Sequence, residues 1–325
     1  MFFMNYGSFL VCGFDGFSVP ADFARFVKEG KPGGVVLFAR NYESPAQLKA
    51  LISELKSLSD LPLFLMVDQE GGTVVRFNEG FPAVSSMRTF GEERDFDGLF
   101  SACRETAETL KTAGIDMNLA PVVDVITEPK NEYLRPRTFG DEPFIVSRMA
   151  ACAIEALQAG GVLTCAKHFV ALGDSAKDPH QLLPISNASK EKLEVTFFPP
   201  FRAVIAAGVD CAMTTHIRVP ALDEKEPVVF SAKAISVLRT VLGFEGVILT
   251  DDLEMKAIAD NWGVPEAAVL ALAAGNDMAL VCHTLEWQQV AIELIAKEAE
   301  KNSLFARQLV LSRKRIEALW GKKRV

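Results

Sequence analysis

The sequence is poor in histidine and cysteine, with only four and six of these residues in a chain of 325. No two cysteines form a Cys-x-x-Cys pair, and most lie within apolar segments. This distribution is typical of reduced thiols in a protein core and argues against a disulfide framework. We therefore expect a cytoplasmic protein.

A surplus of basic residues is also absent, because 34 Lys and Arg stand against 42 Asp and Glu, a formal net charge of −8. Nucleic-acid phosphates are bound mainly by Lys and Arg, so we expect no nucleic-acid partner. No segment approaches the roughly 20 apolar residues that a membrane helix needs. Residues 1–7 are apolar but lack the basic start of a signal peptide, and we interpret them as leading into a first strand. We expect a monomer that makes no membrane contact.

The sequence does contain a regular series of short apolar segments, most of them flanked by glycine. They lie at 8–12, 34–38, 63–67, 115–119, 162–166, 209–214, 246–250 and 278–282. Segments of this length and composition are typical of strands that are buried on both faces of a parallel sheet.

Helical patterns separate these segments. Ser44 is an expected N-cap before a stripe of leucine and isoleucine, Ser231 is another, and Gly114 is placed to end a third helix. Eight strand–helix units in a chain that is 49% hydrophobic favour the α/β class and a closed (β/α)8 TIM barrel over an open sheet. We expect one domain over residues 1–325, with a helical tail at about 284–322.

All four histidines follow predicted strands. His168 and His180 come after the fifth strand, His216 after the sixth and His283 after the eighth. A single histidine at a strand end is more often a structural residue. Active sites of such barrels form at the carboxyl ends of the strands, so the convergence of all four predicts a functional cleft there.

The third predicted strand ends in Asp68-Gln69-Glu70-Gly71-Gly72, followed by Arg76. Glycines beside a carboxylate let the backbone approach a ligand closely, and an ionised carboxylate accepts two hydroxyl hydrogen bonds from one sugar. A tight turn with an internal Asp68–Arg76 ion pair explains the same residues equally well. The spacing leaves both interpretations open.

Asp178-Pro179-His180 follows the fifth predicted strand. An aspartate two residues before a histidine suits a carboxylate that orients an imidazole and stabilises its cation, and histidine exchanges protons near neutral pH. Metal binding is the rival interpretation, because histidines and aspartates share the predicted rim. No His-x-His or Glu-x-x-His spacing supports it, so we expect neither a metal nor another cofactor.

Taken in order, several motifs resemble glycoside hydrolase family 3, in particular its single-domain bacterial β-N-acetylglucosaminidases that trim peptidoglycan fragments. The resemblance spans nearly the whole chain. It is carried by Gly33-Gly34-Val35-Val36-Leu37-Phe38, Asp68-Gln69-Glu70-Gly71-Gly72, Ala120-Pro121-Val122-Val123-Asp124-Val125, Arg137-Thr138-Phe139-Gly140, Lys167-His168-Phe169, Thr215-His216-Ile217 and Thr250-Asp251-Asp252-Leu253-Glu254-Met255.

The resemblance implies a role for each matching residue. Asp251 matches the nucleophile that forms a covalent glycosyl-enzyme, His180 the general acid/base, and Asp178 its orienting partner. The sugar-binding positions of the −1 subsite match Asp68, Arg76, Arg137, Lys167 and His168. A histidine therefore replaces the second carboxylic acid of most retaining glycosidases. A cationic Lys167 beside Asp251 would help to keep the nucleophile ionised.

The chain departs from the family at one loop. The family usually reads Lys-His-Phe-Pro-Gly-His-Gly-Asp, whereas this chain has Val170-Ala171-Leu172 in place of Pro-Gly-His. That loop helps to shape the pocket around the 2-substituent of the sugar. We therefore expect the substitution to alter substrate preference or loop motion.

The resemblance implies a retaining exo-β-N-acetylglucosaminidase that acts on a carbohydrate substrate, a muropeptide fragment. Two alternatives stay open: a β-glycosidase or glycoside phosphorylase of other sugar specificity, and a catalytically silent barrel that binds muropeptides. Phosphorolysis is chemically open because a histidine acid lacks the charge that would repel phosphate. Taken alone, Asp251 is also a possible N-cap of the helix after the seventh strand.

Overall fold

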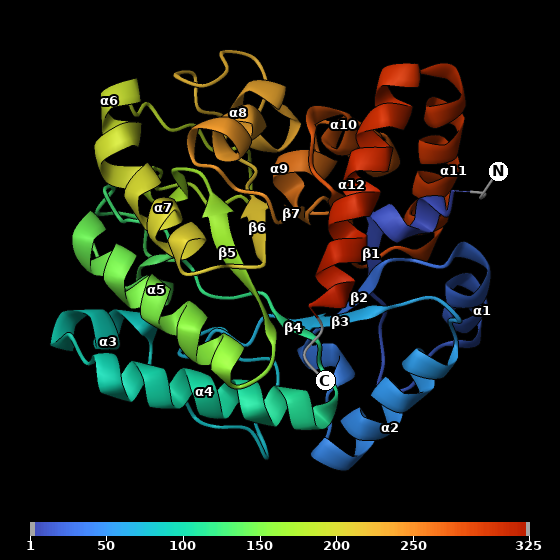
Figure 1. Cartoon of the computed structure of the whole chain (residues 1–325), viewed down its shortest axis with the longest axis horizontal. Helices are drawn as coiled ribbons and strands as arrows, with labels where there is room; N and C mark the ends of the chain where they lie inside the picture. Colours follow the sequence, from blue (N-terminus) through green and yellow to red (C-terminus); the bar gives the residue numbers. More distant parts are fainter. Residues whose placement is uncertain (1–3, 323–325) are drawn as a thin grey trace.

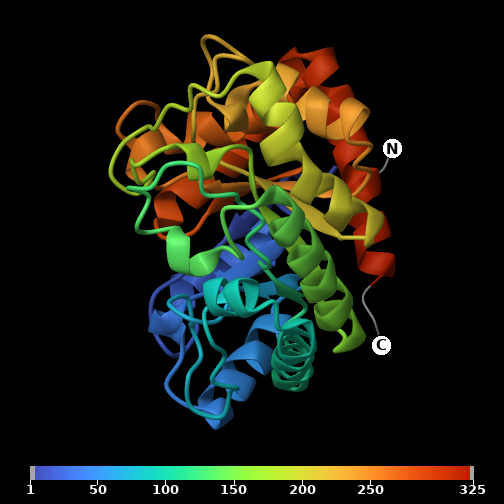
Figure 2. The ribbon, with the colours of Figure 1, turned by 90° about the vertical axis from the view of Figure 1, so that its left-hand side faces the viewer.

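The computed structural model describes residues 4–322, so three residues at each end of the expected domain 1–325 lie outside the described part. Within that part, eight parallel strands pair in chain order, and the eighth pairs with the first to close a barrel. Helices surround the strands (Figures 1 and 2). The predicted α/β class and (β/α)8 barrel are confirmed.

The strands are short, and every one overlaps a segment predicted from the sequence. They are β1 (Leu10–Cys12), β2 (Gly34–Leu37), β3 (Phe64–Val67), β4 (Met117–Asn118), β5 (Leu163–Phe169), β6 (Cys211–Thr214), β7 (Val247–Asp252) and β8 (Met278–Val281). Two extend beyond their predicted ends, because β5 includes Lys167 and His168 and β7 includes Asp251. The predicted start of the first strand is wrong, since Tyr6–Phe9 forms a 3-10 turn.

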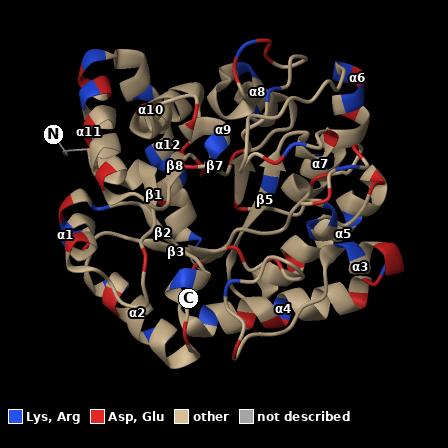
Figure 3. Ribbon diagram, turned by 180° about the vertical axis from the view of Figure 1, so that it is seen from behind, with Lys and Arg blue, Asp and Glu red and all other residues tan. Residues whose placement is uncertain are grey.

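The helices within residues 4–322 are α1 (Ala21–Gly30), α2 (Pro45–Ser57), α3 (Met87–Glu93), α4 (Phe96–Ala113), α5 (Pro143–Ala159), α6 (Lys190–Lys192), α7 (Phe198–Ala206), α8 (Ala232–Ser236), α9 (Lys256–Ala259), α10 (Val264–Ala274), α11 (Leu285–Lys301) and α12 (Ser303–Gly321). The segment expected to be a helical tail contains α11 and α12. Ser44 caps α2 by accepting a hydrogen bond from the N–H of Gln47 at 3.2 Å. Gly114 ends α4 with a φ of 98°, a conformation that favours glycine. Acidic and basic residues are interspersed over the outer helices (Figure 3).

Three buried aspartates stand directly before alternate strands, at the amino-terminal end of the barrel. Asp116 precedes β4, Asp210 precedes β6 and Asp277 precedes β8. Each accepts a hydrogen bond from the second residue of the preceding strand: Leu65 at 2.9 Å, Thr164 at 3.1 Å and Ile248 at 2.8 Å. The three carboxylates therefore fix pairs of neighbouring strands in register.

Helix α12 crosses this same end of the barrel. Arg315 reaches Asp277 at 3.0 Å, Lys322 reaches Asp210 at 3.4 Å, and Trp320 stacks on Phe64 of β3 with ring centroids 3.9 Å apart. The helix thus covers the ends of strands that lie far apart in the sequence. These stabilising contacts lie at the amino-terminal end of the barrel, whereas functional residues of such barrels lie at the carboxyl end.

We predict that Asp277→Ala lowers the free energy of unfolding by about 3–5 kcal/mol, because it removes one partner of a buried charge cluster. The guanidinium groups of Arg239 and Arg315 and the N–H of Ile248 would lose their shared acceptor. Urea unfolding measures the change. As a control, Glu317→Ala breaks an exposed pair with Arg313 and should change stability by less than about 1 kcal/mol. Similar losses in both variants would contradict the assignment.

Candidate active site

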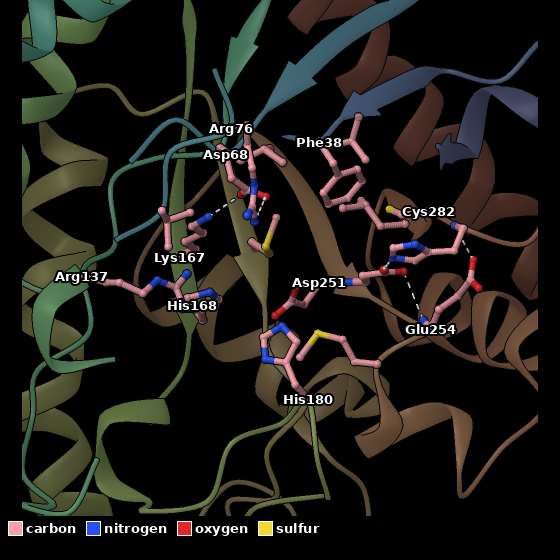
Figure 4. Close-up of a pocket in the computed structure, with 18 of the residues that line it drawn as sticks. Phe38, Asp68, Arg76, Arg137, Lys167, His168, His180, Asp251, Glu254 and Cys282 are labelled. Carbon is pink, nitrogen blue, oxygen red and sulfur yellow. Dashed lines mark hydrogen bonds and ion pairs between the residues drawn. The ribbon is translucent and has the colours of Figure 1, made fainter. Parts of the chain in front are cut away.

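A cavity of about 530 Å³ opens at the carboxyl ends of the strands (Figure 4). Seven of the eight residues predicted for the site line it: Asp68, Arg76, Arg137, Lys167, His168, His180 and Asp251. The eighth, Asp178, does not line the cavity and instead hydrogen-bonds to His180. The residues predicted from the sequence therefore lie together in one cavity; their roles stay a prediction.

Lys167 lies at the centre of a buried charge cluster. Its side chain is 3% exposed, and its Nζ lies 2.6 Å from Asp68 and 2.6 Å from Glu70. Arg137 donates two hydrogen bonds to the carboxylate of Glu70, at 2.9 and 2.8 Å. Arg76 lies 3.4 Å from the second oxygen of Asp68. The Asp68–Arg76 ion pair therefore exists, within a larger cluster at the cavity wall.

The cluster favours the charged forms of Glu70 and Lys167. Burial alone would raise the pKa of Glu70, but Arg137 and Lys167 outweigh it and hold that pKa far below its usual range. Burial likewise opposes the charge of Lys167, and Asp68 and Glu70 reverse the effect, so the pKa of Lys167 is raised. Each buried charge is compensated by its neighbours, as a stable buried ion pair requires.

Asp251 projects into the cavity from the carboxyl end of strand β7. Its Oδ1 accepts a hydrogen bond from the N–H of Asp252 at 2.9 Å, and its Oδ2 has no partner among the described residues. Removal from water would raise the pKa of Asp251, but His216, His168, the Asp252 N–H and Lys167 together lower it. The carboxylate is therefore ionised and has one oxygen free. The N-cap interpretation is wrong, because Met255 precedes α9 and Asp251 caps no helix.

His180 and Asp178 form an exposed pair at the mouth of the cavity. Asp178 Oδ1 lies 2.7 Å from His180 Nδ1 and also accepts a hydrogen bond from the His180 N–H at 2.9 Å. The imidazole is 65% exposed and is turned toward the carboxylate of Asp251 (Figure 4). The carbonyl of Pro179, between the two residues, accepts a hydrogen bond from the N–H of Ala257 in α9. This bond ties the loop to the helix that follows the strand of Asp251.

His168 belongs to a second, buried pair. The segment after β4 runs beside β5, and the N–H of Val123 donates to the carbonyl of Lys167. This pairing places Asp124 against His168, whose N–H and Nδ1 lie 3.0 and 2.8 Å from one carboxylate oxygen. Asp124 therefore fixes the ring that lines the cavity, with its Nε2 left for a ligand.

His216 and His283 both contact Asp252, the neighbour of Asp251. His216 is fully buried, and its Nε2 lies 2.8 Å from the carbonyl oxygen of Asp252. Burial lowers the pKa of His216 despite the nearby carboxylates. His283 Nε2 lies 3.0 Å from the carboxylate of Asp252. All four histidines thus surround the end of β7, as their spacing in the sequence predicted.

The altered loop corrects one expectation. Val170, Ala171 and Leu172 are at most 2% exposed, and none of them lines the cavity. They pack in the core, and Gly173 follows so close to Val125 that an added Cβ would lie 2.0 Å from its carbonyl oxygen. The loop thus supports the base of the Asp178–His180 segment and does not touch the described cavity wall.

The sequence missed several residues of this site, namely Phe38, Glu70, Asp124, Asp252 and Glu254. All five stand within the motifs that carry the family resemblance, and Glu70 and Asp252 lie two residues after Asp68 and one after Asp251. Their charge next to a strand end was an available signal. Asp124 gave no such signal, because its contact with His168 spans 44 residues.

Within residues 4–322, no three His, Cys, Asp or Glu side chains gather in an arrangement that could hold a metal ion. Every helix in the same range falls short of the length or the apolar character that a membrane crossing needs.

A family model for the N-terminal domain of glycosyl hydrolase family 3 matches residues 14–319. The chain belongs to glycoside hydrolase family 3. A β-hexosaminidase of Nitrosomonas eutropha is 36% identical over 278 residues, which cover 80% of this chain and 79% of that protein. The family resemblance drawn from the motifs is confirmed.

Solved structures of family 3 proteins share the fold. A β-N-acetylglucosaminidase from Paenibacillus sp. str. FPU-7 matches with a TM-score of 0.95 and 34% identity, over 98% of this chain and 62% of that one. This chain therefore spans about three fifths of the Paenibacillus protein. Native NagZ from Neisseria gonorrhoeae matches with a TM-score of 0.79 and 29% identity, over 94% of this chain and 96% of that one.

We predict that Glu70→Gln in this family 3 barrel lowers the free energy of unfolding at neutral pH by about 3–5 kcal/mol, because Arg137 and Lys167 lose their shared counter-charge. The pKa of Glu70 is depressed on folding, so its stabilisation is present above the unfolded pKa of about 4.3 and is lost as the pH falls toward the folded value. The difference in free energy of unfolding between Glu70→Gln and the parent should therefore become smaller below about pH 4.3.

Urea unfolding of both proteins from neutral pH down to the acid limit of solubility tests this. Glu92→Gln is the matched control, since Glu92 is exposed and pairs with Arg88 within one helix. A gap between parent and Glu70→Gln that stays constant with pH would show that the Glu70 carboxylate does not provide the stabilisation.

Proposed function

We propose that this chain is a retaining exo-β-N-acetylhexosaminidase that removes terminal N-acetylglucosamine through a covalent glycosyl-enzyme. The observation that carries the proposal is the pairing in one cavity of an ionised carboxylate with a free oxygen, Asp251, and an exposed imidazole held by a carboxylate, His180. Family membership and relatives named β-hexosaminidase and β-N-acetylglucosaminidase support the sugar class.

Asp251 serves as the nucleophile. Its free Oδ2 attacks the anomeric carbon, the bond from that carbon to the leaving oxygen breaks, and a glycosyl ester forms. A lowered pKa keeps this carboxylate ionised at neutral pH. Water then attacks the anomeric carbon from the opposite face, and Asp251 leaves as a carboxylate. Two inversions at one carbon give net retention.

His180 serves as the general acid and then as the general base. It donates a proton to the leaving oxygen in the first step and takes one from water in the second. Asp178 accepts a hydrogen bond from Nδ1 and stabilises the imidazolium, so the reacting atom is Nε2. The exposed position lets the leaving group depart and water enter on the same side.

The buried cluster serves as the −1 subsite. Asp68, Arg76, Arg137, Lys167 and His168 all line the cavity and present polar hydrogen-bonding groups to a sugar. Ion pairs and hydrogen bonds within the cluster hold these groups in place, so a sugar meets donors and acceptors that are already oriented. Lys167 also carries a positive charge near Asp251.

We propose peptidoglycan fragments in the cytoplasm as the substrate and a monomer as the working state. The support is the resemblance of the motifs to the peptidoglycan-trimming enzymes of this family. The six cysteines are all free thiols, and all but Cys152 are buried, as suits a reducing compartment.

We predict that Asp251→Asn retains the fold and binds N-acetylglucosamine but lowers kcat by at least about 10³-fold, because only the covalent step needs the carboxylate. Hydrolysis of an aryl N-acetyl-β-glucosaminide, with and without phosphate, measures the loss and identifies the released sugar. Asp260→Asn, at an exposed aspartate close in sequence, is the control and should keep the parental rate. Parental turnover by Asp251→Asn would make the assignment of the nucleophile wrong.

We predict that His180→Ala lowers kcat/KM on a natural disaccharide by about 10²–10⁴-fold, the range expected for loss of general acid catalysis. Aryl glycosides with acidic leaving groups need little protonation and should lose much less. Gln181→Ala, in the same loop, should affect both substrates alike. If His180→Ala reduced both substrates by the same factor, His180 would not be the acid.

A further inference from the structure

The cavity has a second wall, opposite the buried cluster, to which the reaction above assigns no role. We call Phe38, Asp252, Glu254, Lys256 and His283 the outer wall; all five line the cavity. In Figure 4, Phe38 and Glu254 lie on one side of Asp251, and Lys167, Arg137 and His168 lie on the other.

His283 is held in a fixed position on the outer wall. Its Nε2 lies 3.0 Å from Asp252 Oδ2, and its N–H donates to Glu254 Oε1 at 2.7 Å. Its ring lies against Phe38, with centroids 5.6 Å apart, and the guanidinium of Arg40 covers Phe38 at 4.2 Å. Contacts with Asp252, Glu254 and Phe38 therefore orient the imidazole, although it is 45% exposed.

The carboxylates of the outer wall already have partners. Asp252 Oδ1 accepts from the N–H of Glu254 at 3.1 Å, and Asp252 Oδ2 pairs with His283. Glu254 Oε1 accepts from the N–H groups of His283 and Thr284, and Oε2 accepts from the Thr284 hydroxyl at 2.7 Å. Among the described residues, His283 Nδ1 and the exposed Lys256 Nζ have no such partner. The polar groups that this wall offers to a ligand are thus nitrogens.

The exposure of the two walls indicates which half of a substrate each would meet. Lys167 and His168 are nearly fully buried, whereas Lys256 and His283 are exposed. In an enzyme that removes a terminal sugar, the transferred ring occupies the closed end and the leaving group extends toward solvent. His180, the proposed acid, is also exposed. The outer wall therefore faces the leaving group.

We propose that His283 determines specificity by binding a carboxylate on the leaving group through Nδ1, with Lys256 as a second cationic contact. This inference rests on the proposed hydrolysis of N-acetylglucosaminides and deepens it. The bonded carboxylates and the unpartnered nitrogens of the wall favour an acidic ligand, since a cationic donor binds an anionic acceptor more strongly than a neutral one.

The charged groups around His283 favour its cation. The hydrogen bond from His283 to Asp252 raises the pKa of His283, and the charges of Asp252 and Glu254 raise it further. Burial and the charge of Arg40 lower this pKa by less, so the pKa of His283 is raised overall. The ring therefore stays protonated, with Nδ1 as a donor, closer to neutral pH than a free histidine.

Two matched substrates test the proposal: a β-1,4-linked disaccharide whose second sugar bears an ether-linked carboxylate, and the methyl ester of that carboxylate. The measured quantity is the ratio of kcat/KM for the acid to that for the ester, at neutral pH and low salt. We expect a ratio on the order of ten in the parent, falling as salt screens the contact. His283→Phe keeps a ring against Phe38 and should remove most of this preference for the acid, leaving the part that Lys256 provides. Lys256→Gln should lower it in part, and Lys297→Gln, at an exposed position on α11, should leave it unchanged.

An aryl N-acetylglucosaminide lacks the second sugar, so its kcat/KM in His283→Phe and Lys256→Gln measures any effect of the substitution that reaches Asp251 through Asp252. The ratio for each variant is interpreted after this effect is taken into account. A parental ratio near one, or an unchanged ratio in His283→Phe, would overturn the role of His283 and leave the proposed hydrolase intact. If the parent cleaved no N-acetylglucosaminide, both would be overturned. Lys256 lies on the surface, so Lys256→Gln gives an answer even if His283→Phe fails to fold.

Discussion

The buried ammonium of Lys167 is the constraint on which the rest of the site depends. A cation that is 3% exposed is tolerated only with close counter-charges, and Asp68 and Glu70 supply them at 2.6 Å each. Glu70 then needs Arg137, which comes from the segment after β4. One desolvated charge thus ties together the ends of β3 and β5 and the loop that follows β4. Its positive charge also lowers the pKa of Asp251, so the compensation that stabilises the fold also favours the ionised form of the proposed nucleophile.

The proposed acid/base experiences the opposite environment. Asp178 and His180 lie on an exposed loop, and the interactions that fix them are local: two hydrogen bonds between the pair and one from Pro179 to Ala257. A proton carrier must exchange with solvent between the two steps, whereas a nucleophile must stay ionised and in place. The barrel meets both needs by setting a rigid strand end beside a solvated loop. Its amino-terminal end, closed by Asp116, Asp210 and Asp277, carries the stability.

Local patterns were enough to predict the barrel, because each strand and helix is specified by its own composition, caps and glycines. Strand ends indicated where a cavity would lie, and the family motifs supplied seven of the residues that line it. What the sequence could not give are the partners across the barrel: Lys167 with Asp68 is a contact over 99 residues, and Asp124 with His168 one over 44. Such pairs depend on barrel closure, which composition does not encode residue by residue. The misjudged role of Val170-Ala171-Leu172 has the same cause, since only the packed structure shows that these side chains point into the core.

That burial shifts the question of substrate preference to other residues. Three apolar side chains that do not reach the cavity cannot select a substituent by contact, so their effect must pass through the base of the Asp178–His180 loop. There, Asn131 donates to the carbonyls of Leu172 and Ser175, and Asp174 binds Lys192 and Ser186. Both ends of the loop are thus anchored by buried or half-buried polar contacts. Substrates can therefore be distinguished by direct contact only at the two walls that flank Asp251. In one of these, the buried charge cluster, the charges already pair with one another. The outer wall around His283 is therefore the part of the cavity that we propose to set the preference for the leaving group.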